Sequence, residues 1–140
     1  MISLSCGILV LNEENEILLA HATRTAHWDI LKGRPNAGET PVQTAIREAF
    51  EESGLTFVAS ELVDLGEFSY RSDKNIHLFA IKVRKSMIDT DALHCVSMVD
   101  RGDDSFPEVD RYKWVNPSDI PEYCAKNMIK LLTSLNLSEF

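Results

Sequence analysis

Three glutamates lie close together near the middle of the chain, at positions 48, 51 and 52. On an α-helix, this spacing would place the carboxylates of Glu48, Glu51 and Glu52 within an arc of about 100°. Like charges at this spacing destabilise a helix, so the cluster needs either solvent or a cation. Hard divalent cations such as Mg²⁺ prefer oxygen ligands of this kind. The pattern is typical of a metal site, and a solvated acidic face is the alternative.

The segment that carries these glutamates has strong helix signals. Thr40 is a good N-cap residue, Pro41 suits the first helical position, and Gln43 completes a capping box. Gly54 can adopt the left-handed conformation that ends many helices. We predict a helix over residues 41–53, with an apolar face toward a sheet and the glutamates on the opposite side. The residues of that apolar face are Val42, Ile46, Ala49, Phe50 and Ser53.

The rest of the chain alternates between strand patterns and turns. Runs rich in apolar or β-branched residues predict strands at 3–11, 17–20, 28–31, 61–70, 76–84, 93–99 and 111–115. Residues 33–38 should form an irregular loop, residues 72–75 a hairpin turn, and residues 100–107 a loop. Apolar residues at helical spacing over 125–132 predict a closing helix. Strands interleaved with two helices predict an α/β or α+β fold, with a mixed sheet between helices.

Composition limits the classes of protein that this sequence can encode. The chain has 140 residues, of which 44% are hydrophobic and 26% charged, so we expect a single folded domain over 1–140 and not a disordered chain. The net charge of −8 makes extended nucleic acid an unfavourable partner. The sequence has no apolar stretch of membrane-spanning length and no signal peptide at its start, so we expect no membrane insertion and a cytoplasmic location.

The cysteines do not indicate a metal site or a disulfide framework. Cys6, Cys95 and Cys124 are odd in number, widely spaced and contain no C-x-x-C pair. This pattern favours reduced thiols that fill the core.

The glutamates belong to a longer pattern that resembles a known family. From Gly33 through Glu39 and Arg47 to Leu55, the sequence resembles the Nudix box, G-x5-E-x7-R-E-U-x-E-E-x-G-U, where U is apolar. Ala49 is smaller than the usual residue at the first U position. Residues 28–33 resemble the W-x-F/L-P-K-G run that often precedes the box, with Leu31 in place of proline. The MutT-like Nudix hydrolases thereby become the expected family.

A second segment is similar to particular branches of this family. Glu108 and Trp114 form an E-x5-W pattern similar to that of Nudix dinucleoside polyphosphate hydrolases and RNA pyrophosphohydrolases. In those relatives the glutamate reaches the metals from a loop, which makes Glu108 a candidate for a fourth metal carboxylate or for the base. Asp103 and Asp104 are its competitors, and an ordinary loop acid is the alternative.

The resemblance implies a fold, a metal site and a reaction. It implies an α/β/α sandwich with a central mixed sheet, in which the box forms loop, helix and loop. The implied metal is Mg²⁺, with Mn²⁺ as a substitute, held by Glu48, Glu51, Glu52 and the carbonyl of Lys32. Arg47 would form a salt bridge that orients a box glutamate, and Glu39 would either cap the helix or support the site. Gly33, Gly38 and Gly54 would serve backbone geometry.

The implied reaction is attack by water on a phosphorus of a nucleoside diphosphate linked to a group X. The expected catalytic residues are Glu48, Glu52, Glu108 and Arg47, and the identity of the base among the three glutamates stays open. Diadenosine tetraphosphate is the first choice of substrate. RNA 5′ ends come second, and nucleoside triphosphates or nucleotide sugars third.

Weaker signals suggest which residues contact a small-molecule nucleotide. Basic residues near the box could hold outer phosphates, although for each one taken singly the sequence favours a solvated side chain; they are Arg24, His27, Lys32 and Arg34. Tyr70, His77 and Phe79 could stack on a base, although aromatic residues on strands usually belong to the core.

Two other classes of function compete with an enzyme. One is a catalytically silent nucleotide-binding sensor module. The other is an acidic helical surface that docks a basic protein. The sequence carries no signal for an oligomeric state.

Overall fold

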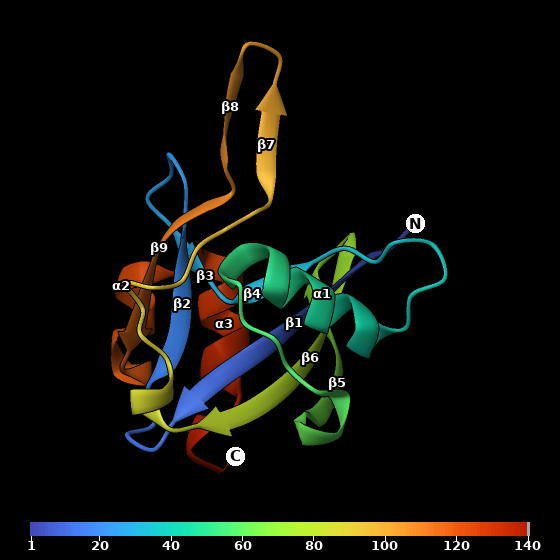
Figure 1. The fold of residues 1–140 in the computed structure, drawn as a ribbon. Coiled ribbons are helices and arrows are strands. Elements are labelled where there is room, and N and C mark those ends of the chain that lie inside the picture. Colours follow the sequence, from blue (N-terminus) through green and yellow to red (C-terminus); the bar gives the residue numbers. More distant parts are fainter. Residues whose placement is uncertain (140) are drawn as a thin grey trace.

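The computed structural model describes residues 1–139, which form one mixed sheet with helices on both faces (Figure 1). The strands of this sheet are β1 (Ser3–Asn12), β2 (Ile17–Ala22), β3 (Trp28–Asp29), β4 (Leu31–Gly33), β5 (Val63–Arg71), β6 (Lys74–Val83) and β9 (Val109–Val115). The helices are α1 (Pro41–Ser53), α2 (Ile120–Tyr123) and α3 (Lys126–Ser134). Short 3-10 helices occupy Ala59–Glu61, Lys85–Met87, Pro117–Asp119 and Leu137–Glu139. The predicted α+β sandwich with a mixed central sheet is confirmed.

The centre of the sheet is a parallel pair surrounded by antiparallel ones. The strand order is β3-β2-β1-β6-β5, in which β1 runs parallel to β6 and antiparallel to β2. Strand β4 also pairs with β1, and β9 pairs with β2. Strand β1 is apolar along most of its length because both of its faces are covered, as is usual for a central strand in a layered fold.

Two hydrophobic cores lie on the two faces of the sheet. Alternate residues of β1, such as Leu9 and Leu11, pack toward α3, where they join Met128 and Leu132. Residues of opposite orientation pack toward α1, where Ala45 and Ala49 are fully buried. In Figure 1, α1 and α3 accordingly lie on opposite sides of β1. This two-faced burial fixes the register of β1 and with it the position of the neighbouring β4.

Helix α1 has the start and end that its sequence predicts. The Thr40 hydroxyl accepts the backbone N–H of Gln43, and the Gln43 side chain accepts the N–H of Thr40. At the other end, Gly54 has a φ of 81° and donates its N–H to the carbonyl of Phe50. The predicted bounds of 41–53 are confirmed.

The predicted strand at 93–99 is wrong over most of its length. Residues 93–97 form a loop along the end of α1, where the Val96 N–H donates to the carbonyl of Glu51 and the His94 N–H donates to that of Ser53. These donors pair with helix carbonyls that have no partner within the helix, so they are not available to a neighbouring strand.

The predicted loop at 100–107 is also wrong. It is largely a hairpin, made of β7 (Met98–Arg101) and β8 (Asp104–Pro107), which projects from the sheet in Figure 1. Gly102 has a φ of 73° and sits in the tight turn between the two strands. A run of polar residues around a glycine can therefore form a hairpin as readily as an open loop.

Smaller differences concern three other boundaries. Strand β5 begins at Val63, because residues 59–61 form a 3-10 turn. The expected turn at 72–75 is shorter, so Lys74 and Asn75 belong to β6. The closing helix predicted over 125–132 is α3, which ends at Ser134, and an additional short helix, α2, precedes it across the extended Cys124.

Two further expectations concern the reduced state of the cysteines and the absence of a membrane-spanning segment. None of the three cysteines forms a disulfide, and burial raises the pKa of Cys6 to about 11. Within residues 1–139, every helix is too short or too polar to span a bilayer.

Candidate metal and phosphate site

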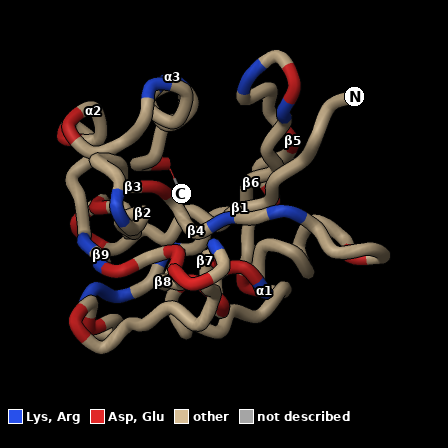
Figure 2. Tube along the Cα trace, turned by 90° about the horizontal axis from the view of Figure 1, so that it is seen from above, with Lys and Arg blue, Asp and Glu red and all other residues tan. Residues whose placement is uncertain are grey.

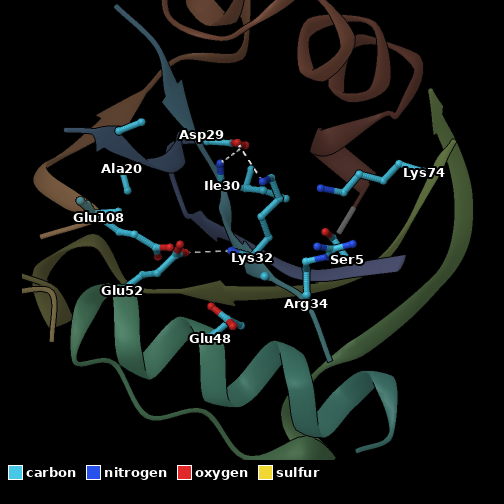
Figure 3. Close-up of a pocket in the computed structure, with 13 residues that line it drawn as sticks. Ser5, Ala20, Asp29, Ile30, Lys32, Arg34, Glu48, Glu52, Lys74 and Glu108 are labelled. Carbon is cyan, nitrogen blue, oxygen red and sulfur yellow. Dashed lines mark hydrogen bonds and ion pairs between the residues drawn. The ribbon is translucent and has the colours of Figure 1, made fainter. Parts of the chain in front are cut away.

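A cavity of about 440 Å³ opens where α1, β4 and the start of β9 meet. Figure 2 shows the basic part of β4 close to the acidic stretch of α1. Figure 3 shows the side chains that line the cavity, with Glu52 and Glu108 on one side, Arg34 and Lys74 on the other, and the Asp29–Lys32 pair between them. The charged residues of the lining are Asp29, Lys32, Arg34, Glu48, Glu52, Lys74 and Glu108.

Three of these carboxylates form a compact cluster. Oxygen atoms of Glu48, Glu52 and Glu108 all lie within 4.8 Å of one another. Glu48 and Glu52 are each only 9% exposed, whereas Glu108 is exposed at the mouth. Burial raises the pKa of Glu48 and raises that of Glu52 well above its ordinary value, and the neighbouring carboxylates add to both shifts. The positive charge near the cluster is therefore too small to balance three ionised carboxylates.

The expectation that the glutamates lie opposite the buried face of the helix is wrong for two of the three. Glu48 and Glu52 are buried on the same side of α1 as Ala45 and Ala49, whereas Phe50 is 48% exposed. Pattern reasoning assigned a carboxylate to solvent and a phenyl ring to the core. The tertiary structure reverses both assignments, because the sheet leaves a polar cavity beneath this part of the helix.

The third box glutamate has a different neighbour. Glu51 lies outside the cavity lining and accepts a hydrogen bond from Nη1 of Arg47 at 3.0 Å. Of the four carboxylates predicted for the metal site, Glu48, Glu52 and Glu108 form the cluster, whereas Glu51 is not part of it.

Arg47 forms the predicted salt bridge to a box glutamate and also contacts the loop before α1. Its guanidinium donates to Glu48 at 2.9 Å, to Glu39 at 2.7 Å, and to the carbonyl of Arg34 at 2.8 Å. Hydrogen bonds from Arg47, and then from the Asn36 N–H, lower the pKa of Glu39 to about 2. Glu39 therefore braces the loop before α1 and does not cap the helix, whose cap is Thr40.

Gly33 and Lys32 fix the positions of the two buried carboxylates. A Cβ atom on Gly33 would lie 2.0 Å from the carboxyl carbon of Glu48, so only glycine leaves room for this side chain. The Lys32 N–H donates to Oε1 of Glu52 at 2.9 Å. The Lys32 ammonium pairs with Asp29 at 3.2 Å, and although burial opposes its charge, this carboxylate raises the pKa of Lys32.

Glu108 reaches the cluster from a β-bulge. The pairing of β2 with β9 shifts register between His21 and Ala22, which leaves Asp110 as the extra residue of β9. The backbone of Glu108 is held on both sides, because its carbonyl accepts the Thr23 N–H at 3.0 Å and its N–H donates to Ser97 at 2.9 Å. Bulges of this kind redirect side chains beside functional sites.

A buried ring braces this bulge. The Nδ1 atom of His21 lies 2.5 Å from a carboxylate oxygen of Asp110, and its Nε2 atom lies 2.8 Å from the carbonyl of Thr25. His21 is 6% exposed and packs edge-on against Trp28. The ring therefore joins β2, the loop after it, and β9 just beyond Glu108.

The competitors of Glu108 lie elsewhere. Asp104 accepts two hydrogen bonds from Arg24, at 2.6 and 3.0 Å. Asp103 is exposed in the turn of the β7–β8 hairpin. Neither residue lines the cavity.

The predicted substrate contacts separate into two groups. Lys32 and Arg34 line the cavity, whereas the other five residues do not. Arg24 is paired with Asp104, and His27 is exposed in the turn before β3. His77 and Phe79 stack on each other along β6, and Phe79 belongs to the core on the α1 side. Tyr70 lies at a separate cavity between β5 and α3.

Sequence reasoning missed Lys74, Asp29 and Ser5, which also line the cavity. The sequence around Lys74 predicts a turn, and neither its neighbours nor its spacing indicates a site. Only the pairing of β6 beside β1 brings it to the cavity.

The residues present fit a hard divalent cation. The donor set is three carboxylates from two elements, two of them buried with raised pKa values, and glycine at position 33 leaves the space that one of them occupies. Such an oxygen-only set suits Mg²⁺ or Mn²⁺. A cation would remove the electrostatic cost of placing these carboxylates together.

Comparison with known proteins agrees with this arrangement. The NUDIX domain model matches residues 1–135. An uncharacterized 17.7 kDa protein from the e-segB intergenic region of Enterobacteria phage T4 is 32% identical over 132 residues, covering 81% of this chain and 86% of that protein. A putative 8-oxo-dGTP diphosphatase of Bacillus subtilis is 26% identical over 120 residues, covering 86% of this chain and 70% of that protein.

A solved structure extends the comparison to the fold. The crystal structure of a C. elegans Ap4A hydrolase binary complex superposes with a TM-score of 0.65 at 23% identity, covering 97% of this chain and 99% of that one. The matches support the expected activity class, a hydrolase that acts on acid anhydrides. The family model spans nearly the whole chain, and Gly33, Glu48 and Glu52 of the box line one cavity, so this chain belongs to the Nudix family.

Proposed function

We propose that this protein hydrolyses a phosphoanhydride bond of a nucleoside polyphosphate with the help of Mg²⁺, and that diadenosine tetraphosphate is its preferred substrate. The observation that carries the proposal is the cluster of Glu48, Glu52 and Glu108 in a cavity that is also lined by lysine and arginine side chains. Nudix enzymes generally use a divalent metal. A substrate with a long phosphate chain would span both ends of such a cavity.

Each residue of the cluster has a proposed task. Glu48, Glu52 and Glu108 hold the metal, with the Lys32 carbonyl as a further ligand, and one of the three carboxylates takes the proton from water. Arg47 orients Glu48 through its hydrogen bond, and the Lys32 N–H orients Glu52. When bound, Mg²⁺ neutralises phosphate charge and lowers the pKa of bound water. Lys32 and Arg34 hold phosphate oxygens.

The choice of substrate rests on resemblance to known hydrolases. The E-x5-W segment from Glu108 to Trp114 is similar to that of dinucleoside polyphosphate hydrolases. The solved structure with a closely similar fold is named an Ap4A hydrolase. Hydrolysis of single nucleoside triphosphates is the second candidate, because the Bacillus subtilis relative is named as a putative 8-oxo-dGTP diphosphatase.

The burial of the glutamates argues against the non-enzyme readings. A docking surface for a basic protein needs solvent-exposed carboxylates, whereas Glu48 and Glu52 are each 9% exposed. A silent sensor module has no need for a complete set of buried carboxylates.

A substrate panel tests the proposal. Diadenosine tetraphosphate, ADP-ribose, dGTP and a 5′-triphosphate RNA oligonucleotide are each incubated with the protein, with Mg²⁺ or with EDTA, in oxygen-18 water. We expect the fastest turnover for diadenosine tetraphosphate and none in EDTA, and the labelled product identifies the attacked phosphorus. Faster turnover of ADP-ribose or dGTP would refute the substrate, and turnover in EDTA would refute the metal.

A further inference from the structure

The end of the cavity away from the carboxylates is basic. Lys32, Arg34 and Lys74 line this part, and Figure 3 shows Arg34 and Lys74 across the cavity from Glu52 and Glu108. In the same view the Lys74 ammonium points inward, toward Lys32. Apart from the Asp29–Lys32 pair, the basic side chains thus lie across the cavity from Glu52 and Glu108.

Two of these cations have no carboxylate partner. Lys32 pairs with Asp29 at 3.2 Å, and nearby Arg71 pairs with Asp73 at 3.1 Å. Within residues 1–139, neither Arg34 nor Lys74 forms a salt bridge, although the chain has eight more acidic than basic residues. In a protein so rich in carboxylates, two unpaired cations in one cavity leave a place for an anion.

The surroundings of Lys74 agree with this interpretation. Partial burial, and then the positive charges of Lys32, Arg71 and Arg34, lower the pKa of Lys74. An anion bound between these side chains would remove that repulsion. Phosphate oxygens are the natural ligands of such a group, because lysine and arginine donate charge-assisted hydrogen bonds to them.

Lys74 is held on paired backbone and is not a loose lysine at the rim. It is the first residue of β6, where it pairs with Ser3 of β1 and Arg71 of β5. The Ser3 N–H donates to the carbonyl of Asp73 at 3.0 Å, which fixes the preceding turn. A cation on a backbone that is paired on both sides can hold a ligand at a defined distance from the carboxylates.

We infer that Arg34 and Lys74 form a subsite for the outer phosphates of a polyphosphate chain whose reacting phosphate lies at Glu48, Glu52 and Glu108. The subsite selects substrates with three or more phosphates over those with two, such as ADP-ribose. The inference rests on the proposed function for the identity of the reacting end, but phosphate binding itself requires no catalysis.

A matched pair of variants on the same strand tests the subsite. Lys74→Met and Lys82→Met each remove one positive charge from β6, but Lys82 is exposed and lies outside the cavity lining. Calorimetry measures the binding of inorganic triphosphate and of pyrophosphate to the whole protein in MgCl₂, with folding checked by circular dichroism. We expect Lys74→Met to weaken triphosphate binding about tenfold and pyrophosphate binding less than about twofold, and Lys82→Met to change neither.

Several outcomes would overturn the subsite. Equal losses in the two variants would mean that net charge alone acts. Equal losses for the two ligands in Lys74→Met would mean that the lysine does not contact an outer phosphate. An absence of triphosphate binding to the parent would also overturn it. If instead triphosphate binds as expected but no nucleotide is hydrolysed, the proposed function fails and the subsite stands.

Discussion

Glu48 and Glu52 are carried by a helix whose start, end and register are determined by its own residues, whereas Glu108 lies just before a bulge and is held by contacts from two distant segments. Thr40, Gln43 and Gly54 define α1 within the span of the box. Glu108 instead depends on Thr23, Ser97 and the His21–Asp110 pair. One half of the site is therefore local in sequence and the other half is assembled by tertiary structure.

This difference has a consequence for how each half can fail. A substitution on the helix should act at the substituted side chain, because the cap and the packing of Ala45 and Ala49 hold the backbone. A substitution near Glu108 should act at a distance, because it moves the segment that carries the carboxylate. Substitutions on the two sides should therefore differ in how they lower activity.

The largest effect is expected for Glu52→Gln, which removes a carboxylate and keeps its shape. We expect kcat for nucleoside polyphosphate hydrolysis with Mg²⁺ to fall by about 10²-fold or more, because the buried donor no longer carries a charge for the metal or for a proton. Steady-state kinetics measure the change. Glu122→Gln, which neutralises an exposed acid on α2, is the control, and similar rates for the two variants would remove Glu52 from the proposed site.

Gly33→Ala tests the helix side through its neighbour. The new Cβ would displace the Glu48 carboxylate, so we expect kcat to fall by roughly 10- to 100-fold. The φ of Gly33 is not positive, so alanine can adopt the same backbone conformation without strain. The melting temperature should therefore stay close to that of the parent. Gly38→Asn is the control in the same loop, since a Cβ there has no neighbour within 4 Å and asparagine tolerates a φ of 81°. Equal loss in both variants would indicate a loop effect.

His21→Gln tests the other side of the comparison. It should lower kcat about tenfold by releasing Asp110 and the bulge, as is typical of residues that orient a ligand. Because His21 acts through Glu108 in this interpretation, the loss should largely disappear when Glu108→Gln is already present.

Two results bear on that double-mutant cycle. Asp104→Asn removes an exposed ion pair with Arg24, outside the cavity lining, and should change kcat less than about twofold. If the His21 and Glu108 losses were additive, His21 would have a separate structural role.

The smallest effect is a change in stability with pH in the absence of metal. Burial raises the pKa of Glu52 in the folded protein above its pKa in the unfolded chain. The protonated carboxyl therefore stabilises the fold fully at pH values below the unfolded-state pKa, and this contribution is lost as the pH rises through the folded-state pKa. Without metal at pH 7, Glu52→Gln should therefore melt about 2–4 °C above the parent. The difference in melting temperature between Glu52→Gln and the parent should be smaller at pH 5. Thermal melts followed by circular dichroism check this, and a variant less stable than the parent at pH 7 would contradict it.

Sequence reasoning was accurate where the relevant interactions are local. The bounds of α1 follow from a capping box and a terminal glycine, and the central strands follow from apolar runs that are buried on both faces. It failed at residues 93–97, where the partners are carbonyls at the end of α1, and at 100–107, where polar residues pair across a tight turn. It also assigned Phe50 to the core, because a periodic pattern does not reveal that the sheet has a polar cavity at that point.

The sequence by itself determined the family, the helix that carries two carboxylates, and the acidic character of the site, since these depend on residue types at fixed spacing along one segment. Only the tertiary structure decided that Glu108, and not its competitors Asp103 and Asp104, joins Glu48 and Glu52. It also decided that Glu51 pairs with Arg47 and that Lys74 lines the same cavity. These last positions depend on strand pairing and on a bulge between segments far apart in the chain. Contacts of this kind are set by the packing of the whole sheet, and no local pattern encodes them.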